Sequence, residues 1–316
     1  MKCLKTIKVN GQYYNCGQCV NCRANKASQW KLRCLYELSN CDSAIFITFT
    51  YSDEWLLSHN PNRSLIKKDI QDFNKRIRAD IKYHNLPINY RFYIAGEYSD
   101  PPLERPHYHG ILFGLDRYNP VHRKLIVDNW CPENAKRCES WQFDDLSRGK
   151  KCGLQDVTPE DIGYTVAYVS KKLTGNYAKS EYEDKGREPP FHLVSQGLGL
   201  QFAIENKERL INTGYSMING SRVGIPRYFR EKLGIEITTW SKIDRKERII
   251  KDMDYLRSEF EKAYPKVKIT SSLSSLVNYE RMFEFWYESH QWNLANKVFE
   301  DYQRRNQLLR GKNSVY

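Results

Sequence analysis

The sequence predicts an α+β fold in which helices flank an antiparallel sheet. Three stretches rich in β-branched and aromatic residues are typical of strands, at 44–51, 89–97 and 107–113. A segment with the helical spacing of apolar residues separates the first two strands. The order strand, helix, strand, strand predicts an antiparallel sheet with its helices on one side.

Two helices accompany these strands. The first is expected from Ala24 to Leu38, where Trp30, Cys34 and Leu38 recur at the spacing of an apolar stripe. The second buries residues at helical spacing, Ile66, Ile70, Phe73, Ile77 and Ile81. Its other face is basic, with Lys67, Lys68, Lys75, Arg76, Arg78 and Lys82. Such a face either follows phosphate groups or is an ordinary solvated surface.

The rest of the chain predicts less regular structure. Residues 115–157 are expected to be irregular, and residues 174–190 to form a polar loop or lid. Charged helical patterns follow at 242–261 and 277–309. We therefore expect a basic cysteine-rich segment at 1–42, a central domain at 43–235 and a charged helical carboxy-terminal region at 236–316.

The chain is strongly basic, with a net charge of +12 and a sequence pI of about 9.1. This charge favours an anionic partner such as nucleic acid, although a basic protein without such a partner would share it. No apolar run approaches the ~20 residues that cross a bilayer. The first residues include lysines but lack the apolar core of a secretion signal. A membrane partner is therefore not expected.

The cysteines suggest a metal site near the amino end. Nine cysteines, an odd number, favour thiols or metal ligands over a disulfide framework. Cys16, Cys19 and Cys22 form two overlapping CxxC units, and Cys3 offers a fourth thiolate, which would complete a tetrahedral zinc site. Strong zinc patterns have two separated CxxC pairs, which this chain lacks. Cysteines in an ordinary turn are the alternative.

Two histidines alternate on the third strand, in Arg105-Pro106-His107-Tyr108-His109-Gly110. Residues i and i+2 share a face of a strand, so His107 and His109 point together and Tyr108 points away. Two imidazoles on one face can bind a metal ion. Glu97, at the end of the preceding strand, is the candidate third ligand, since a carboxylate beside imidazoles suits Mn²⁺ or Mg²⁺. Alternating surface histidines and an ordinary surface carboxylate are the alternatives.

A further helix is expected to begin near Thr158, which can cap it, with Pro159 at its first position. At roughly 100° per residue, one stripe is aliphatic, with Ile162, Val166, Val169 and Leu173. The opposite stripe carries Tyr164, Tyr168 and Lys171, with Lys172 at its margin. The helix would bury its aliphatic stripe and present two phenols beside lysines. Taken singly, each tyrosine also fits the edge of a core, and lysines usually lie in water.

Together these motifs resemble the HUH endonucleases, the family of rolling-circle replication initiators and relaxases. Tyr108 stands where the family has its bulky apolar residue U, and Thr48-Phe49-Thr50-Tyr51 looks like the family's first motif. Over roughly residues 1–235 the chain resembles the initiators of gokushovirus-type microviruses. That closer likeness rests on Cys16 to Cys22, Gly96-Glu97-Tyr98 and Ile225-Pro226-Arg227-Tyr228.

The resemblance implies a sheet of about five strands and an enzyme that nicks viral replicative-form DNA at its origin. A tyrosine would form a 5′-phosphotyrosine bond and leave a 3′-hydroxyl that primes synthesis, and the displaced strand would later be rejoined. Mg²⁺ or Mn²⁺ would assist at His107, His109 and Glu97. Tyr168 is the first-choice nucleophile, because Lys171 and Lys172 follow one turn later and would stabilise negative charge; Tyr164 would act second.

The resemblance also implies the partners. They are origin DNA, single-stranded or supercoiled, with a helicase and a polymerase of the host, in the bacterial cytoplasm. Two rival functions stay open. A non-enzymatic zinc-containing DNA-binding protein would bind DNA without any covalent adduct. A plasmid-type initiator or relaxase would use a single tyrosine.

Overall fold

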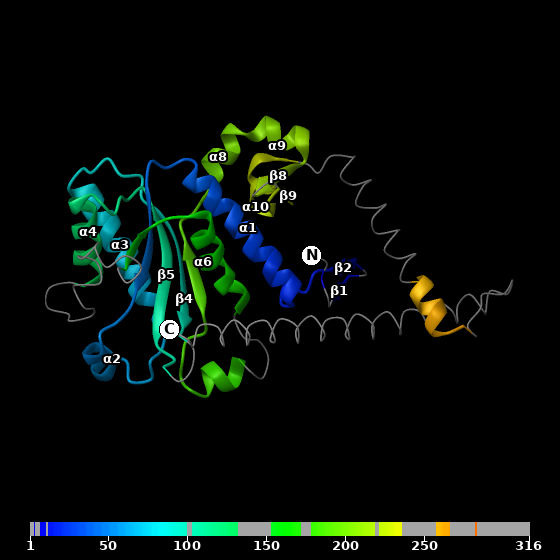
Figure 1. Ribbon diagram of the computed structural model, residues 1–316, viewed down its shortest axis with the longest axis horizontal. Coiled ribbons are helices and arrows are strands. Elements are labelled where there is room, and N and C mark those ends of the chain that lie inside the picture. The colour runs from blue at the N-terminus through cyan, green and yellow to red at the C-terminus, as the bar shows by residue number, and fades with distance from the viewer. Residues whose placement is uncertain are drawn as a thin grey trace, which may run out of the picture. The chain divides into compact units, whose positions relative to one another are not determined.

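The computed structural model describes residues 3, 7–10, 12–99, 103–131, 153–171, 178–218, 221–235, 257–265 and 282. The chain forms two compact units, one of residues 26–235 and one of residues 1–25 together with 236–316. The larger unit holds a five-stranded sheet and its helices (Figure 1). The smaller unit holds a hairpin of β1 (Ile7–Val9) and β2 (Gln12–Tyr14).

The sheet is antiparallel throughout, with the strand order β6-β3-β5-β4-β7. The strands are β3 (Ala44–Phe49), β4 (Arg91–Tyr98), β5 (Pro106–Phe113), β6 (Leu154–Asp156) and β7 (Phe191–Val194). The three long strands in the middle are those that the sequence predicts, and short strands lie at both edges. The predicted α+β fold, an antiparallel sheet of five strands with flanking helices, is confirmed.

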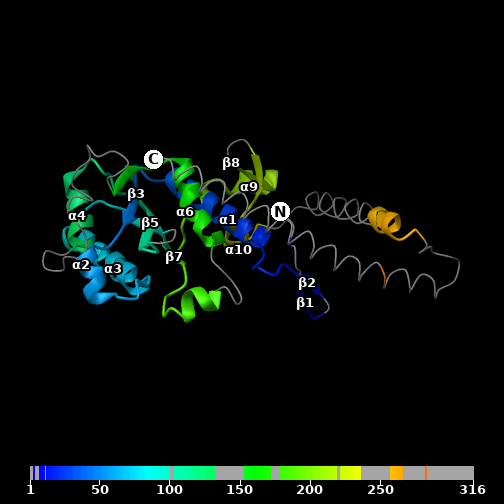
Figure 2. The same cartoon turned by 60° about the horizontal axis from the view of Figure 1, so that its bottom comes forward.

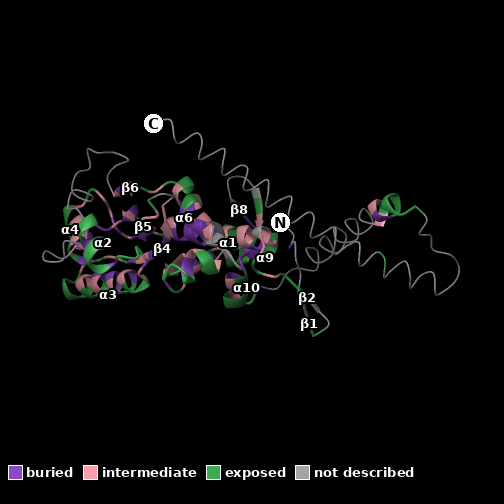
Figure 3. Ribbon diagram, turned by 90° about the horizontal axis from the view of Figure 1, so that it is seen from below, coloured by how far each residue is buried: buried purple, intermediate pink, exposed green. Residues whose placement is uncertain are grey.

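Three helices lie on one side of the sheet: α2 (Asp53–His59), α3 (Lys67–Tyr83) and α4 (Pro120–Trp130). The expected apolar stripe of α3 is buried there, with Ile70, Phe73 and Ile77 packed in the same core as Trp130 of α4. The lysines of α3 point outward, and Figure 3 shows exposed residues along this helix. The amphipathic helix predicted at this place is therefore confirmed.

The other face of the sheet is covered by α1 (Val20–Leu38) and α6 (Pro159–Lys171), which lie side by side (Figures 1 and 2). The expectation that the helices lie on one side is therefore wrong. The reason is visible in the central strands. Tyr93 and Ile111 point to one face while Ile94 and Leu112 point to the other, and all four are buried. Both faces are apolar, so both need cover.

A third group of elements packs on the later turns of α1. It consists of η2 (Lys179–Glu183), α8 (Leu200–Glu205), α9 (Lys207–Thr213), β8 (Tyr215–Ile218), β9 (Ser221–Gly224) and α10 (Arg227–Leu233), of which all but η2 follow the sheet in the chain. Leu32 and Tyr36 of α1 join Leu210 and Phe229 in this core. The element η2 buries Tyr182 within the stretch expected to be a polar loop.

Two elements occupy the stretch 115–157 that we expected to be irregular. The start of α4 has a recognisable signal, since the Asn119 side chain accepts from the N–H of Val121 at 2.9 Å and Pro120 stands first in the helix. The strand β6 has only three residues, too few to show a period. Residues 132–152 and 172–177, and most of the helices predicted at 242–261 and 277–309, lie outside the described residues.

Among the described residues, no helix combines the length and the apolar character that crossing a bilayer requires.

Candidate active site

Strands β3, β4 and β5 bring the predicted metal ligands onto one face of the sheet. Glu97 of β4 is the register partner of His107 on β5, and His109 lies opposite Thr48 of β3. Directly opposed residues of antiparallel strands point to the same face. This is the face that α1 and α6 cover. Tyr108 points into the core on the other face, as the alternation predicts.

The three side chains meet at one point. His107 Nε2 lies 2.9 Å from Glu97 Oε1, and His109 Nε2 lies 3.5 Å from the same oxygen. One ligand atom from each residue lies within 4.8 Å of the others. Two nitrogens and a carboxylate oxygen, gathered where each side chain is largely buried, fit a divalent cation such as Mg²⁺ or Mn²⁺. We call Glu97, His107 and His109 the His–His–Glu trio.

Hydrogen bonds orient both imidazoles. His107 Nδ1 donates to the backbone oxygen of Arg105 at 3.1 Å, and His109 Nδ1 lies 3.1 Å from Thr48 Oγ1. Each contact occupies Nδ1 and leaves Nε2 directed at Glu97, the arrangement that fixes a ligating histidine. The sequence does not single out Thr48 as a site residue by its spacing. Only the pairing of β3 with β5 places it beside His109.

Helix α6 begins with a reciprocal pair of hydrogen bonds. The Asp161 N–H donates to Thr158 Oγ1 at 3.2 Å, and the Thr158 N–H donates to the Asp161 carboxylate at 2.8 Å. The predicted helix start is confirmed. Ile162 and Val166 are buried on the sheet, as expected, and they fix the rotation of the helix. That rotation carries the two tyrosines of α6 to the trio.

Both tyrosines lie against one histidine of the trio. The Tyr168 ring is stacked on the His109 imidazole, with ring centroids 5.4 Å apart and an interplanar angle of 12°. The Tyr164 ring meets the same imidazole edge-on, also at 5.4 Å. The two phenol rings are 4.8 Å apart. The i, i+4 spacing of the tyrosines therefore places two phenols at one metal-ligating residue.

The two phenols differ in exposure. Tyr164 is 50% exposed, but Tyr168 is only 2% exposed. The expectation that α6 presents both phenols is wrong for Tyr168, because its flat ring packs on the His109 imidazole and joins the core. Burial raises the pKa of the Tyr168 phenol, and the nearby Glu97 carboxylate raises it further. Removing the phenol proton therefore requires positive charge close to Glu97.

The predicted lysines end the described part of α6. Lys171 is its last residue, and the Lys171 side chain and the whole of Lys172 lie outside the described residues. Another cation, which the sequence does not indicate, comes from α1. Lys31 Nζ lies 3.2 Å from the point that a Cβ on Gly163 would occupy. An ammonium group is thus one residue along α6 from Tyr164, and only the packing of α1 beside α6 brings it there.

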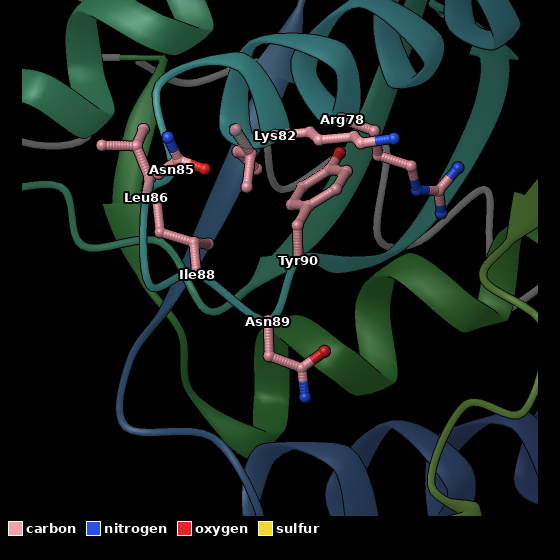
Figure 4. Close-up of a pocket in the computed structure, with 8 residues that line it drawn as sticks. Arg78, Lys82, Asn85, Leu86, Ile88, Asn89 and Tyr90 are labelled. Carbon is pink, nitrogen blue, oxygen red and sulfur yellow. The ribbon is translucent and has the colours of Figure 1, made fainter.

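The basic face of α3 lies across the sheet from the trio. Lys68 is paired with Asp72 at 2.6 Å, and Arg76 donates to the Asn129 backbone oxygen at 2.6 Å. A pocket of about 540 Å³ at the end of α3 lies on that side, lined by residues that include Arg78 and Lys82 (Figure 4). Neither the trio nor the tyrosines line it. This surface is therefore separate from the candidate site.

The predicted thiol ligands also come together, within the smaller unit. The sulfur atoms of Cys3, Cys16, Cys19 and Cys22 all lie within 4.8 Å of one another. These four residues, with Cys34 and Cys41, are thiols. Cys131, in contrast, is disulfide-bonded, so the expectation of thiols or metal ligands holds for the other six described cysteines but not for this one.

Replacing Glu97 by alanine is expected to weaken Mn²⁺ binding by at least about 10–100-fold. The change removes the one anionic ligand of the trio, and it lies near the end of β4, so the fold should survive. Isothermal titration calorimetry measures the affinity, with Glu183→Ala, an exposed carboxylate on η2, as the matched control. An unchanged affinity for Mn²⁺ would place the third ligand elsewhere.

Comparison with known proteins adds relatives to this geometry. A family model for replication-associated proteins of the ORF2 type matches residues 44–173, a segment that contains the trio and both tyrosines. Replication-associated protein ORF2 of Spiroplasma virus 4 is 27% identical over 227 residues, which cover 69% of this chain and 67% of the relative. Replication-associated protein VP4 of Bdellovibrio phage phiMH2K is 28% identical over 224 residues, 69% of this chain and 66% of the relative.

A third relative is replication-associated protein ORF4 of Chlamydia phage 1, which is 26% identical over 235 residues, 72% of this chain and 55% of the relative. The matched part thus spans between about half and two thirds of each relative's length. No solved structure matches the chain.

Proposed function

We propose that this chain, which is a replication-associated protein of the microvirus type, initiates rolling-circle replication by nicking viral replicative-form DNA at its origin. A tyrosine would be joined to the 5′-phosphate of the nicked strand, and the displaced strand would later be rejoined. One observation carries the proposal. Two phenols of α6 lie against His109, a member of the His–His–Glu trio.

In the proposed reaction, the oxygen of Tyr168 attacks the phosphorus of the scissile phosphate. A bond from tyrosine to phosphorus forms while the bond from phosphorus to the 3′ oxygen breaks, and that oxygen leaves as the 3′-hydroxyl that primes synthesis. A Mg²⁺ or Mn²⁺ ion held by the trio supplies polarisation of the phosphate when bound. The stack of Tyr168 on His109 holds the phenol in place before attack, which reduces the ordering left to the transition state.

Negative charge develops on the phosphate and its leaving oxygen, and nearby cations lower the cost of that charge. We assign this role to Lys171 or Lys172, which follow Tyr168 by about one helical turn. Lys31 is a further candidate, because its ammonium lies over Gly163 beside Tyr164. The net charge of +12 supports the same anionic substrate for the chain as a whole.

Tyr164 gives the site a second phenol at the same histidine. After one round of synthesis, Tyr164 would attack the regenerated origin while Tyr168 still holds the old 5′ end. The ring separation of 4.8 Å lets both phenols work beside one trio. The exposure of Tyr164 leaves its ring accessible to an incoming strand.

The proposed partners follow from this reaction. The substrate would be origin DNA, as a single strand or a supercoiled duplex, and a helicase and a polymerase of the host would extend the 3′ end. The proposed cofactors are Mg²⁺ or Mn²⁺ at the trio and a structural Zn²⁺ at the cysteines. The proposed compartment is the cytoplasm of the bacterial host.

A zinc-containing DNA-binding protein without enzymatic activity is a second candidate, and the four gathered thiols favour it. That function uses the cysteines but gives no role to phenols stacked on a metal-ligating histidine. A plasmid-type initiator or relaxase with one tyrosine differs from the proposal only in the role of Tyr164.

The test uses supercoiled plasmid that carries the viral origin, incubated with the protein and Mn²⁺. We expect nicked circles together with a protein–DNA adduct that survives denaturation in detergent. Both products should be absent when a chelator is added, or when the plasmid lacks the origin. A protein that only binds DNA would retard the plasmid on a gel and leave no adduct.

A further inference from the structure

A tight hairpin brings Cys3 to the other three cysteines. β1 and β2 pair from Ile7 with Tyr14 to Val9 with Gln12, so Asn10 and Gly11 alone connect them. Asn10 has a φ of 50°, the left-handed conformation that an Asn-Gly hairpin loop uses. Cys3 precedes this hairpin and Cys16 follows it. Fold topology therefore supplies the fourth thiol where the sequence has no second CxxC pair.

The four sulfur atoms are spaced like the corners of a tetrahedron. Cys16 Sγ lies 4.0 Å from Cys22 Sγ, and Cys19 Sγ lies 4.0 Å from Cys3 Sγ. All four sulfurs lie within 4.8 Å of one another, and none is in a disulfide. Bonds of about 2.3 Å from zinc to sulfur put the sulfurs of a tetrahedral site roughly 3.8 Å apart. The observed spacing leaves room for one ion at the centre.

We propose that Cys3, Cys16, Cys19 and Cys22 bind one structural zinc ion. Four thiolates at tetrahedral spacing are the ligand set of closed structural zinc sites, whereas Mg²⁺ and Ca²⁺ prefer oxygen ligands. The site is distinct from the His–His–Glu trio in residues, in ligand chemistry and in the compact unit to which it belongs.

Backbone hydrogen bonds to the sulfurs support this assignment. The N–H of Cys16 donates to Cys3 Sγ at 3.2 Å, and the N–H of Cys19 donates to Cys16 Sγ at 3.3 Å. Donors directed at sulfur stabilise thiolate charge and orient metal ligands. Gly17 lies between the two donors with a φ of 73°, and a side chain would be strained in this turn.

The segment also lacks another means of holding its shape. Among its described residues up to Asn25, only Cys3 and Cys22 are buried, while Ile7, Val9 and Tyr14 are 46–50% exposed. A small segment without an apolar core needs a metal or a disulfide to fold. Because these cysteines are thiols, the metal is the stabilising element that the structure supports.

The experiment measures zinc in the full-length protein, purified with its thiols reduced, by elemental mass spectrometry. We expect about one zinc per chain. Cys19→Ser and Cys22→Ser should each lose most of that zinc, and Cys41→Ser, a half-buried thiol outside the cluster, should retain it. A zinc content near zero, iron in place of zinc, or equal loss in Cys41→Ser would overturn the proposal.

A second measurement serves if the cysteine variants fail to fold. Unaltered protein is treated with a mercurial thiol reagent, and released zinc is followed with a zinc-binding dye. Release that is complete when about four thiols have reacted supports a four-thiolate site. Absence of zinc release overturns it. Neither readout depends on DNA nicking, so the zinc site and the proposed nickase can fail separately.

Discussion

Alanine at His107 or at His109 is expected to lower the rate of origin nicking by at least about 10²–10³-fold. Each change removes one of the two imidazoles of the trio, and with it a contact that acts mainly on the charge of the transition state. DNA binding should largely survive, because lysines and arginines supply most phosphate contacts. Nicking is measured as conversion of supercoiled plasmid to nicked circles, and binding by fluorescence anisotropy of a labelled origin strand.

The two variants have different structural consequences. His109 also stacks on Tyr168 and Phe46, so its loss disturbs packing as well as metal binding, and His107→Ala is the cleaner test. His84→Ala, at an exposed position after α3, is the matched control and should nick normally. Thermal melting confirms that each variant is folded. Metal-dependent nicking by the double variant His107→Ala/His109→Ala would contradict the assignment of the trio.

Replacing Tyr168 by phenylalanine is expected to reduce the first-round DNA adduct by on the order of 10³-fold or more, since the change removes the attacking oxygen. Phenylalanine keeps the ring, so the stack on His109 and the burial of the site should be preserved. Single-turnover formation of the adduct with labelled origin DNA measures the effect. Tyr83→Phe, which removes the hydroxyl of an exposed tyrosine at the end of α3, is the control.

Tyr164→Phe should act later in the reaction. The first cleavage should proceed, because Tyr168 is intact, but termination and re-initiation on a circular template should fail. Multi-round synthesis with a purified polymerase and helicase reveals the difference as products of uncontrolled length. Normal multi-round synthesis by Tyr164→Phe would mean that one tyrosine suffices and that Tyr164 only packs against His109.

Local periodicity predicted the strands and the metal ligands well. In β5, alternation alone requires His107 and His109 to share a face and Tyr108 to face the other core. Glu97 could be proposed because it stands at the end of the neighbouring strand. Its distance of 2.9 Å from His107 depends on the register between β4 and β5, which periodicity does not specify. The ligand types were therefore predictable, but their contact was not.

The remaining features depend on contacts between segments far apart in the sequence. A helical pattern sorts residues by polarity, so it could not predict that Tyr168 becomes buried by packing on His109. Lys31 reaches Gly163 only because α1 and α6 lie side by side. Cys3 joins the cysteine cluster through the β1–β2 hairpin. No spacing between neighbouring residues carries this information.

The most direct test of the central claim identifies the residue that carries DNA. The adduct formed in one round on origin DNA is digested with nuclease and trypsin, and the nucleotide-bearing peptide is sequenced by mass spectrometry. We predict that the nucleotide is attached to Tyr168. Attachment to Tyr164 would reverse the proposed order of the two phenols. A nucleotide on a peptide that contains neither tyrosine, or nicking without any adduct, would contradict the account.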